Sequence, residues 1–240
     1  MEIFKSKGLV LKTIKYSESS IITHILTREL GVRSFIINGA RKPKSTMPAS
    51  LFQHGNFLQI VAYNKPSGQL ARIREVSPAH HYSQLPYKIE KSSIAVFILE
   101  VIENTVRLED VDPALFDFLE DKFIQLDRIQ NGFGHFHLKF LVDYTKWLGI
   151  RPMENYSHEK IYFNMEAGRF TTSESERLGM NKEKSEMLFA LLTQESKIWE
   201  SISISKKLRM SLLRDLLVYY QIHIDGFKTI QSLDVLEQIF

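Results

Sequence analysis

The sequence predicts an α+β protein, with a small β-barrel at the N-terminus followed by a mostly α-helical domain. Residues 7–75 consist of short runs rich in β-branched and aromatic residues, each bounded by turn residues. After Tyr87 the apolar residues recur at helical spacing, and a hairpin pattern at residues 161–172 interrupts them. We therefore expect a barrel domain at residues 1–80 and a helical domain with a β-hairpin insertion at residues 81–240.

The barrel is predicted from five strand-like runs. They are Leu9–Ile14, Ile21–Thr27, Val32–Asn38, Phe57–Ala62 and Leu70–Val76. Gly31 and the turn-forming tract at residues 64–68 mark sharp connections between runs. Five short strands of this length suit a small antiparallel barrel, and the OB-fold is a barrel of that size. Such a barrel needs large side chains to fill its centre, so its aromatic residues are expected in the core and none is assigned to base stacking.

The helices of the second domain are predicted from apolar residues spaced three or four positions apart. The segment Ser77–Pro86 has no clear period and is expected to mark the domain boundary. The first apolar stripe then runs from Ile94 to Val106. A second helix has a clear start, because Asp112 can accept hydrogen bonds from free backbone N–H groups and Pro113 suits the first helical position. Further helices are expected at residues 133–148, 182–194 and 205–224, and from residue 232 onward.

Charge is distributed unevenly between the two predicted domains. Residues 1–80 contain twelve Lys or Arg against four Asp or Glu, whereas residues 81–240 contain nineteen against twenty-four. The overall charge of +3 therefore hides a strongly basic first domain. A basic surface attracts polyanions, most often nucleic acid and sometimes an acidic membrane surface or an acidic protein tail.

The segment Gly39–Ser45 is the strongest candidate for a phosphate-binding loop, because it places three cations directly after a predicted strand. Lys and Arg bind phosphates by displacing counterions, and Arg can contact two oxygens at once. A solvated surface loop is the alternative explanation, but the surplus of cations on the same barrel, Lys7, Lys12 and Lys15 among them, favours binding. The candidate nucleic-acid-binding residues are Arg33, Arg41, Lys42, Lys44, Arg72 and Arg74.

Several kinds of chemistry are excluded or disfavoured. The chain has no cysteine, which excludes disulfides, thiolate nucleophiles and cysteine-ligated zinc. The histidine pairs at 80–81 and 135–137 lack the spacing of helical zinc ligands, and no Walker A, G-x-G-x-x-G or G-x-S-x-G motif occurs. With no apolar run of ~18 residues and no signal-peptide layout, we expect a soluble, cytoplasmic protein without a membrane partner. We also expect no enzymatic activity, metal or cofactor.

Four N-terminal stretches carry a resemblance to a known family. They are Gly8–Thr13, Tyr16–Ser19, Leu26–Gly31 and Gly39–Ser45. In order and spacing they resemble the RecO family of recombination mediators over about the first 55 residues. The later helical segments and the ending Ser232–Leu236 are similar to the family's C-terminal part more loosely.

The resemblance implies an N-terminal OB-fold followed by a mostly helical domain. It also implies binding to single- and double-stranded DNA, annealing of complementary strands, and partnership with RecR and the single-strand-binding protein SSB. In the family these activities help to load the RecA recombinase on gapped DNA during repair. Many members carry a four-cysteine zinc module where this chain has its hairpin, so we expect packing to hold the hairpin and transfer no zinc-dependent property.

Two other classes of function stay open. The chain could be an interaction adaptor that binds an acidic partner tail but neither form of DNA. Lys206, Lys207 and Arg209 hint at such a partner, because the helix dipole disfavours cations at an N-terminal turn, although a solvated face is the commoner explanation. The chain could also be an enzyme such as a nuclease, which would show metal-dependent turnover. The sequence favours a non-catalytic protein that binds and anneals DNA.

Overall fold

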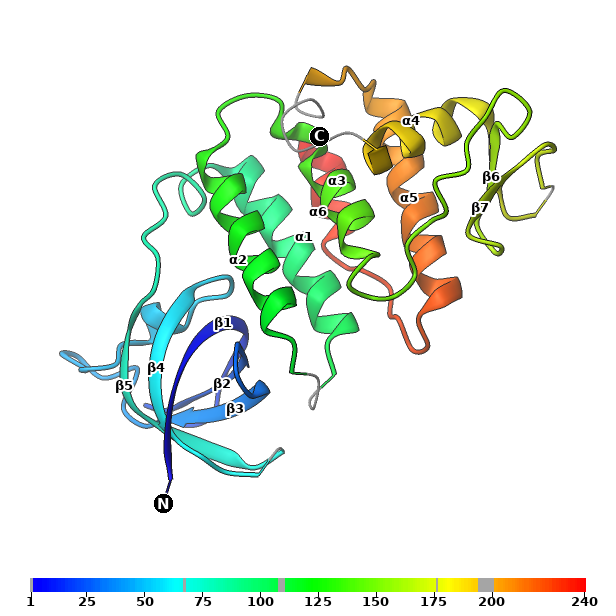
Figure 1. The fold of residues 1–240 in the computed structure, drawn as a ribbon. Helices are drawn as coiled ribbons and strands as arrows, with labels where there is room; N and C mark the ends of the chain where they lie inside the picture. The colour runs from blue at the N-terminus through cyan, green and yellow to red at the C-terminus, as the bar shows by residue number, and fades with distance from the viewer. Residues whose placement is uncertain (1, 67, 108–110, 176, 194–200) are drawn as a thin grey trace. The chain divides into compact units, whose positions relative to one another are not determined.

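The structure is a computed structural model that describes residues 2–66, 68–107, 111–175, 177–193 and 201–240. The chain separates into two compact units, Met1–Arg128 and Ile129–Phe240 (Figure 1). The first unit contains the barrel and two helices, and the second contains four helices and a small sheet among the described residues. The predicted α+β class is confirmed. The domain boundary expected near residue 80 stays a prediction.

The barrel is built from the five predicted strands. They are β1 (Ile3–Lys15), β2 (Ile21–Thr27), β3 (Gly31–Ile37), β4 (Phe57–Tyr63) and β5 (Leu70–Pro78). They close in the order β1-β2-β3-β5-β4, and only β3 and β5 run parallel. A five-stranded Greek-key barrel of this kind is the OB-fold, so the predicted fold of the first domain is confirmed.

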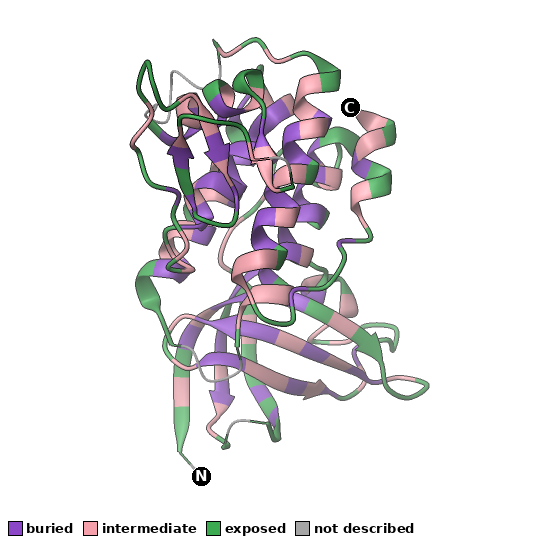
Figure 2. Ribbon diagram, turned by 90° about the vertical axis from the view of Figure 1, so that its right-hand side faces the viewer, coloured by how far each residue is buried: buried purple, intermediate pink, exposed green. Residues whose placement is uncertain are grey.

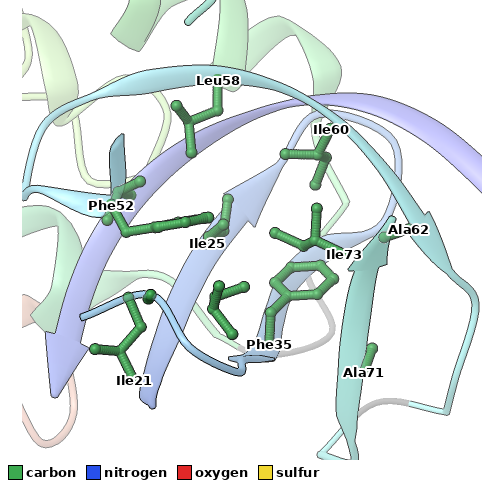
Figure 3. Close-up of a cluster of buried hydrophobic side chains, with 12 residues drawn as sticks. Ile21, Ile25, Phe35, Phe52, Leu58, Ile60, Ala62, Ala71 and Ile73 are labelled. Carbon is green, nitrogen blue, oxygen red and sulfur yellow. The ribbon is translucent and has the colours of Figure 1, made fainter. Parts of the chain in front are cut away.

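Side chains that point inward at alternate positions along the strands fill the barrel interior. Ile25 of β2 and Phe35 of β3 point into this interior (Figure 3). Phe52 joins them from the short 3₁₀ turn η1 (Ala49–Phe52). The twelve buried members of the cluster are Val10, Ile21, Ile25, Phe35, Ile37, Ala40, Phe52, Leu58, Ile60, Ala62, Ala71 and Ile73. Figure 2 shows buried and more exposed residues alternating along the barrel strands. The expectation that the barrel aromatics serve the core rather than base stacking agrees with the burial of Phe35, Phe52 and Phe57. It is wrong for Tyr16, which is 60% exposed, and Tyr63 is only half-buried.

Two helices that contact each other belong to the same unit as the barrel. They are α1 (Ile89–Thr105) and α2 (Pro113–Arg128). The predicted cap of α2 is confirmed, because Asp112 Oδ1 accepts hydrogen bonds from the backbone N–H groups of Ala114 at 3.0 Å and Leu115 at 2.9 Å. The ring of Phe57 on β4 meets the ring of Phe116 edge-on at 5.7 Å, so the barrel and α2 share apolar packing.

The second unit contains α3 (Phe136–Tyr144), preceded by the turn η2 (Phe133–His135), α4 (Lys182–Thr193), α5 (Lys206–His223) and α6 (Leu233–Ile239). Helix α3 packs against α4 and α5. The prediction that the third helix reaches residue 148 is wrong, because α3 ends at Tyr144. The Thr145 hydroxyl donates to Val142 O, and the N–H groups of Lys146 and Trp147 donate to carbonyls three residues back, which replaces the helix with tight turns.

The predicted hairpin in the second unit is confirmed. Strands β6 (Tyr162–Asn164) and β7 (Arg169–Thr171) pair antiparallel, and β8 (Gly179–Met180) joins β6 on its other side. The rings of Phe163 and Phe170 lie 5.1 Å apart, and Phe170 also meets the ring of Tyr156 at 5.3 Å. Asn155 both donates to and accepts from the backbone of Phe170. Aromatic packing and these hydrogen bonds therefore hold the hairpin to the segment before it.

No helix within the described ranges is long and apolar enough to cross a membrane.

Candidate nucleic-acid interface

The basic loop Gly39–Ser45 follows β3 and consists of two successive turns. The Lys42 N–H donates to Gly39 O at 3.0 Å, and the Ser45 N–H donates to Lys42 O at 3.3 Å. Gly39 and Lys44 have positive φ, at 71° and 58°. The turns leave the side chains of the three predicted cations in this loop, Arg41, Lys42 and Lys44, exposed to solvent.

Arg41 also ties the basic loop to the β1–β2 connection. Its backbone N–H donates to Ser19 O at 3.0 Å, and its guanidinium Nη1 donates to Glu18 O at 3.0 Å. Arg41 thus fixes the position of the neighbouring turn while its side chain remains exposed. A phosphate contact by this residue would come from the part of the guanidinium that faces solvent.

Parallel pairing of β3 with β5 brings Arg72 close to the basic loop. Ile36, the residue before the end of β3, pairs with Arg72. On β5 the buried residues Ala71 and Ile73 alternate with Arg72 and Arg74, so both arginines lie on the outer face. Arg72 lines a small pocket together with the loop residue Ser45. The structure therefore brings four of the six candidates to one region, namely Arg41, Lys42, Lys44 and Arg72.

The two other candidates are placed differently. Arg74 is exposed, lies two residues farther along β5, and has its Nε 3.5 Å from Glu75 Oε1. Arg33 lies near the start of β3, at the strand end opposite to the basic loop, and shares the face of the inward-facing residues Phe35 and Ile37. It is half-buried, and its Nη1 donates to Val32 O at 3.1 Å. The alternation of side chains along a strand already indicates this inward position of Arg33 from the sequence.

Ion pairs within the first unit neutralise several other barrel cations. Lys7 Nζ lies 2.7 Å from Glu120 Oε2 on α2, and Lys12 Nζ lies 3.6 Å from Glu103 Oε1 on α1. The expectation that Lys7 and Lys12 add to one field with the basic loop therefore needs correction, because an acidic side chain faces each of them.

Arg28 of the β2–β3 turn forms a bidentate pair with α2. Its Nε and Nη2 each donate to one oxygen of Asp117 at 2.7 Å. These hydrogen bonds hold the pKa of Asp117 below its ordinary value. By contrast, no acidic partner lies within ion-pair distance of Arg41, Lys42, Lys44 or Arg72 among the residues that the structure describes. These four cations therefore form one group of positive charge that no described acidic side chain neutralises.

An apolar row on the outer barrel surface leads to Arg72, and it was not predicted from the sequence. Register pairs Ile14 with Ile22, Ile22 with Ile36, and Ile36 with Arg72 across four strands. Ile14 is 42% exposed, and Tyr16 in the adjoining turn is 60% exposed. This row crosses the β2–β3 face, which is the face on which OB-folds bind oligonucleotides. Alternation within each strand indicates an outward position, but only the register shows that the residues form a row.

The fold and this surface together define a class of protein, an OB-fold protein with a helical C-terminal region and a basic loop beside the β2–β3 face. The family profile described as Recombination protein O N terminal matches residues 1–82, and that of Recombination protein O C terminal matches residues 86–230. The chain belongs to the RecO family of DNA repair proteins, and the resemblance noted from the sequence is confirmed.

Curated relatives agree with this assignment over nearly the whole chain. The DNA repair protein RecO of Phocaeicola vulgatus is 31% identical over 239 residues, which cover 98% of each chain. That of Flavobacterium psychrophilum is 31% identical over 238 residues, again covering 98% of each chain. That of Bacteroides fragilis is 29% identical over 238 residues with the same coverage.

Proposed function

We propose that this protein is a non-catalytic DNA-binding and strand-annealing mediator of recombinational repair. It acts in the cytoplasm, binds single- and double-stranded DNA, and works with RecR and SSB to help load RecA on gapped DNA. Membership of the RecO family supports the role in repair. The observation that carries the DNA-binding part is the gathering of four exposed cations, Arg41, Lys42, Lys44 and Arg72, without an acidic partner among the described residues.

Binding of this kind depends on charge and is largely independent of base sequence. Arg41, Lys42 and Lys44 are the leading phosphate contacts, Arg72 lies beside them, Arg74 supports them, and Arg33 contributes least because of its inward placement. Phosphate contacts position a strand without reading its bases. Annealing follows because two polyanions that are neutralised on one surface repel each other less.

A salt titration of the wild-type protein tests the proposal. Four engaged phosphates predict that the logarithm of the affinity for a single strand falls against the logarithm of salt concentration with a slope of about −3. Fluorescence anisotropy with a labelled oligonucleotide measures this slope. An affinity that does not change with salt would contradict the proposal. Binding to an acidic peptide but to neither form of DNA would support the adaptor class, and cleavage of the oligonucleotide in magnesium would indicate a nuclease.

Lys44 allows the contribution of its charge to be separated from its effect on stability. It is the one non-glycine residue with positive φ among the described residues, and a left-handed backbone costs a residue with a Cβ roughly 1–2 kcal/mol. Lys44→Gly should therefore leave the free energy of unfolding unchanged or raise it by up to about 1 kcal/mol, while it weakens DNA binding by removing a cation.

Chemical denaturation and anisotropy measure the two effects of Lys44→Gly. Lys42→Gly is the matched control, because it removes the same charge at a position without positive φ and should gain no stability. A Lys44→Gly protein that bound DNA as tightly as wild type would remove Lys44 from the interface.

A further inference from the structure

A small pocket opens where β3 and β5 separate. These strands pair over only three residues each, from Ser34 to Ile36 and from Leu70 to Arg72. Beyond the last pair, Ser45, Thr46 and Met47 line the gap between the two strands, and the pocket there has a volume of about 190 Å³. Ile36 and Met47 contribute apolar surface, and Asn38, Ser45, Thr46 and Arg72 contribute polar groups.

The pocket has the size and chemistry for one planar ring. Its volume lies below the roughly 300–1,000 Å³ of pockets that bury whole drug-sized ligands, so a complete nucleotide does not fit inside it. The amide nitrogen of Asn38 makes no hydrogen bond with any described residue, and Asn38 Oδ1 accepts from Ser20 Oγ at 3.4 Å. The Asn38 amide and the Arg72 guanidinium are both donors, and nucleobase edges carry ring-nitrogen and carbonyl acceptors.

The position of the pocket connects it to the basic loop. Ser45 belongs both to the loop and to the pocket lining, so a sugar–phosphate chain held by Lys42 and Lys44 would pass beside the pocket opening. We infer that this pocket takes one unpaired nucleobase of a single strand whose phosphates lie on the basic loop. The inference rests on the proposed function and adds a second kind of contact to it.

Such a contact separates single strands from duplexes. In a duplex each base is stacked and paired, and it must be flipped out, at a cost in free energy, before it can enter a pocket. The phosphate contacts alone do not distinguish the two forms in this way. The pocket therefore favours single strands without selecting a sequence, because the donors at its rim can meet acceptors on more than one base.

The experiment compares two strands with the same backbone. The probes are an oligothymidylate and an abasic oligonucleotide of equal length, and both are titrated against the full chain. Wild type is expected to bind oligothymidylate roughly five- to tenfold more tightly than the abasic strand, the low end of the contribution of one base in known single-strand binders.

Two variants fill the pocket from opposite sides and leave every cation in place. Ile36→Phe places a larger side chain on the strand side of the pocket, and Thr46→Phe places one on the loop side. If one variant does not fold, the other still tests the inference. Each variant should bind oligothymidylate more weakly and the abasic strand as tightly as wild type does, so that the two affinities become similar. Leu70→Phe is the matched control, because Leu70 is exposed on β5 outside the pocket lining, and it should preserve the wild-type difference.

Equal wild-type affinity for the two probes, or a difference that persists in both folded pocket variants, would overturn the inference while leaving the phosphate contacts intact. Absence of binding to either probe would instead reject the proposed function, and the pocket assignment with it.

Discussion

Replacing Arg41, Lys42 and Lys44 together with alanine is expected to weaken DNA binding on the order of a hundredfold at low salt. Each of these side chains is exposed and has no acidic partner among the described residues, so each is available to displace a counterion. The salt dependence should also become shallower by about two units of slope for a single strand, because three fewer phosphates are engaged.

A matched triple variant separates a local site from a change in overall charge. Lys206, Lys207 and Lys228 are exposed in the second unit. Replacing them with alanine removes three positive charges, as many as the loop variant loses. Their loss should change affinity and slope far less than loss of the basic loop. Comparable weakening by the two triple variants would indicate a diffuse electrostatic effect and no local site.

Folding of the loop variant must be measured beside its binding, because Arg41 also donates to Glu18 O. Loss of that hydrogen bond is expected to cost about 0.5–1.5 kcal/mol, since a typical hydrogen bond contributes that much. Thermal unfolding followed by circular dichroism should therefore show a modestly lower midpoint with a preserved cooperative transition.

The largest effect on stability is expected at Asp127, near the end of α2. The residue is 3% exposed, and its carboxylate accepts hydrogen bonds from the backbone N–H groups of Ser83 at 3.0 Å, Gln84 at 2.8 Å and Leu85 at 2.7 Å. Asp127→Ala leaves these donors without their acceptor, and the free energy of unfolding should fall by about 3–5 kcal/mol. Denaturant titration of the full chain measures the change.

The ionisation of Asp127 predicts how this effect depends on pH. Burial by itself would raise the pKa of Asp127, but the N–H groups of Ser83, Leu85 and Gln84 outweigh burial and hold it below the ordinary value. A carboxylate with a lowered pKa stabilises the fold above its unfolded pKa of about 3.9, and this contribution is lost as pH falls toward the folded value.

Asp127→Asn isolates that dependence, because it keeps the shape and one acceptor oxygen but cannot ionise. The stability advantage of wild type over Asp127→Asn should be full near neutral pH and shrink as the pH falls below about 4. An advantage that stayed constant across this range would show that the charge of Asp127 does not stabilise the fold.

Local patterns predict most of the elements of this fold. Strand β2 has its predicted bounds, and the Asp112 cap places the start of α2 correctly. Strand β1 is longer than predicted, because it extends back to Ile3 to pair with β4 before it pairs with β2. The small and polar residues Lys5 to Gly8 interrupt the apolar pattern there, so only the cross-strand partner reveals the strand.

The candidate site is predicted less completely, because part of it depends on contacts between distant residues. The cations of the basic loop are neighbours in sequence and could be identified from it. Arg72 lies close to them only because β3 and β5 pair in parallel. The charge of Lys7 is neutralised by Glu120, which lies 113 residues away in sequence. Asp127 organises the segment that appeared featureless in sequence, from a position 42 to 44 residues away.

Cross-linking shows whether DNA binds at the basic loop, because it reports where DNA lies on the folded protein. A photoreactive single-stranded oligonucleotide is bound to the wild-type chain at low salt, irradiated, and mapped by mass spectrometry. We expect adducts in the basic loop and in the part of β5 that contains Arg72. Adducts confined to residues 129–240, with the barrel unlabelled, would contradict it.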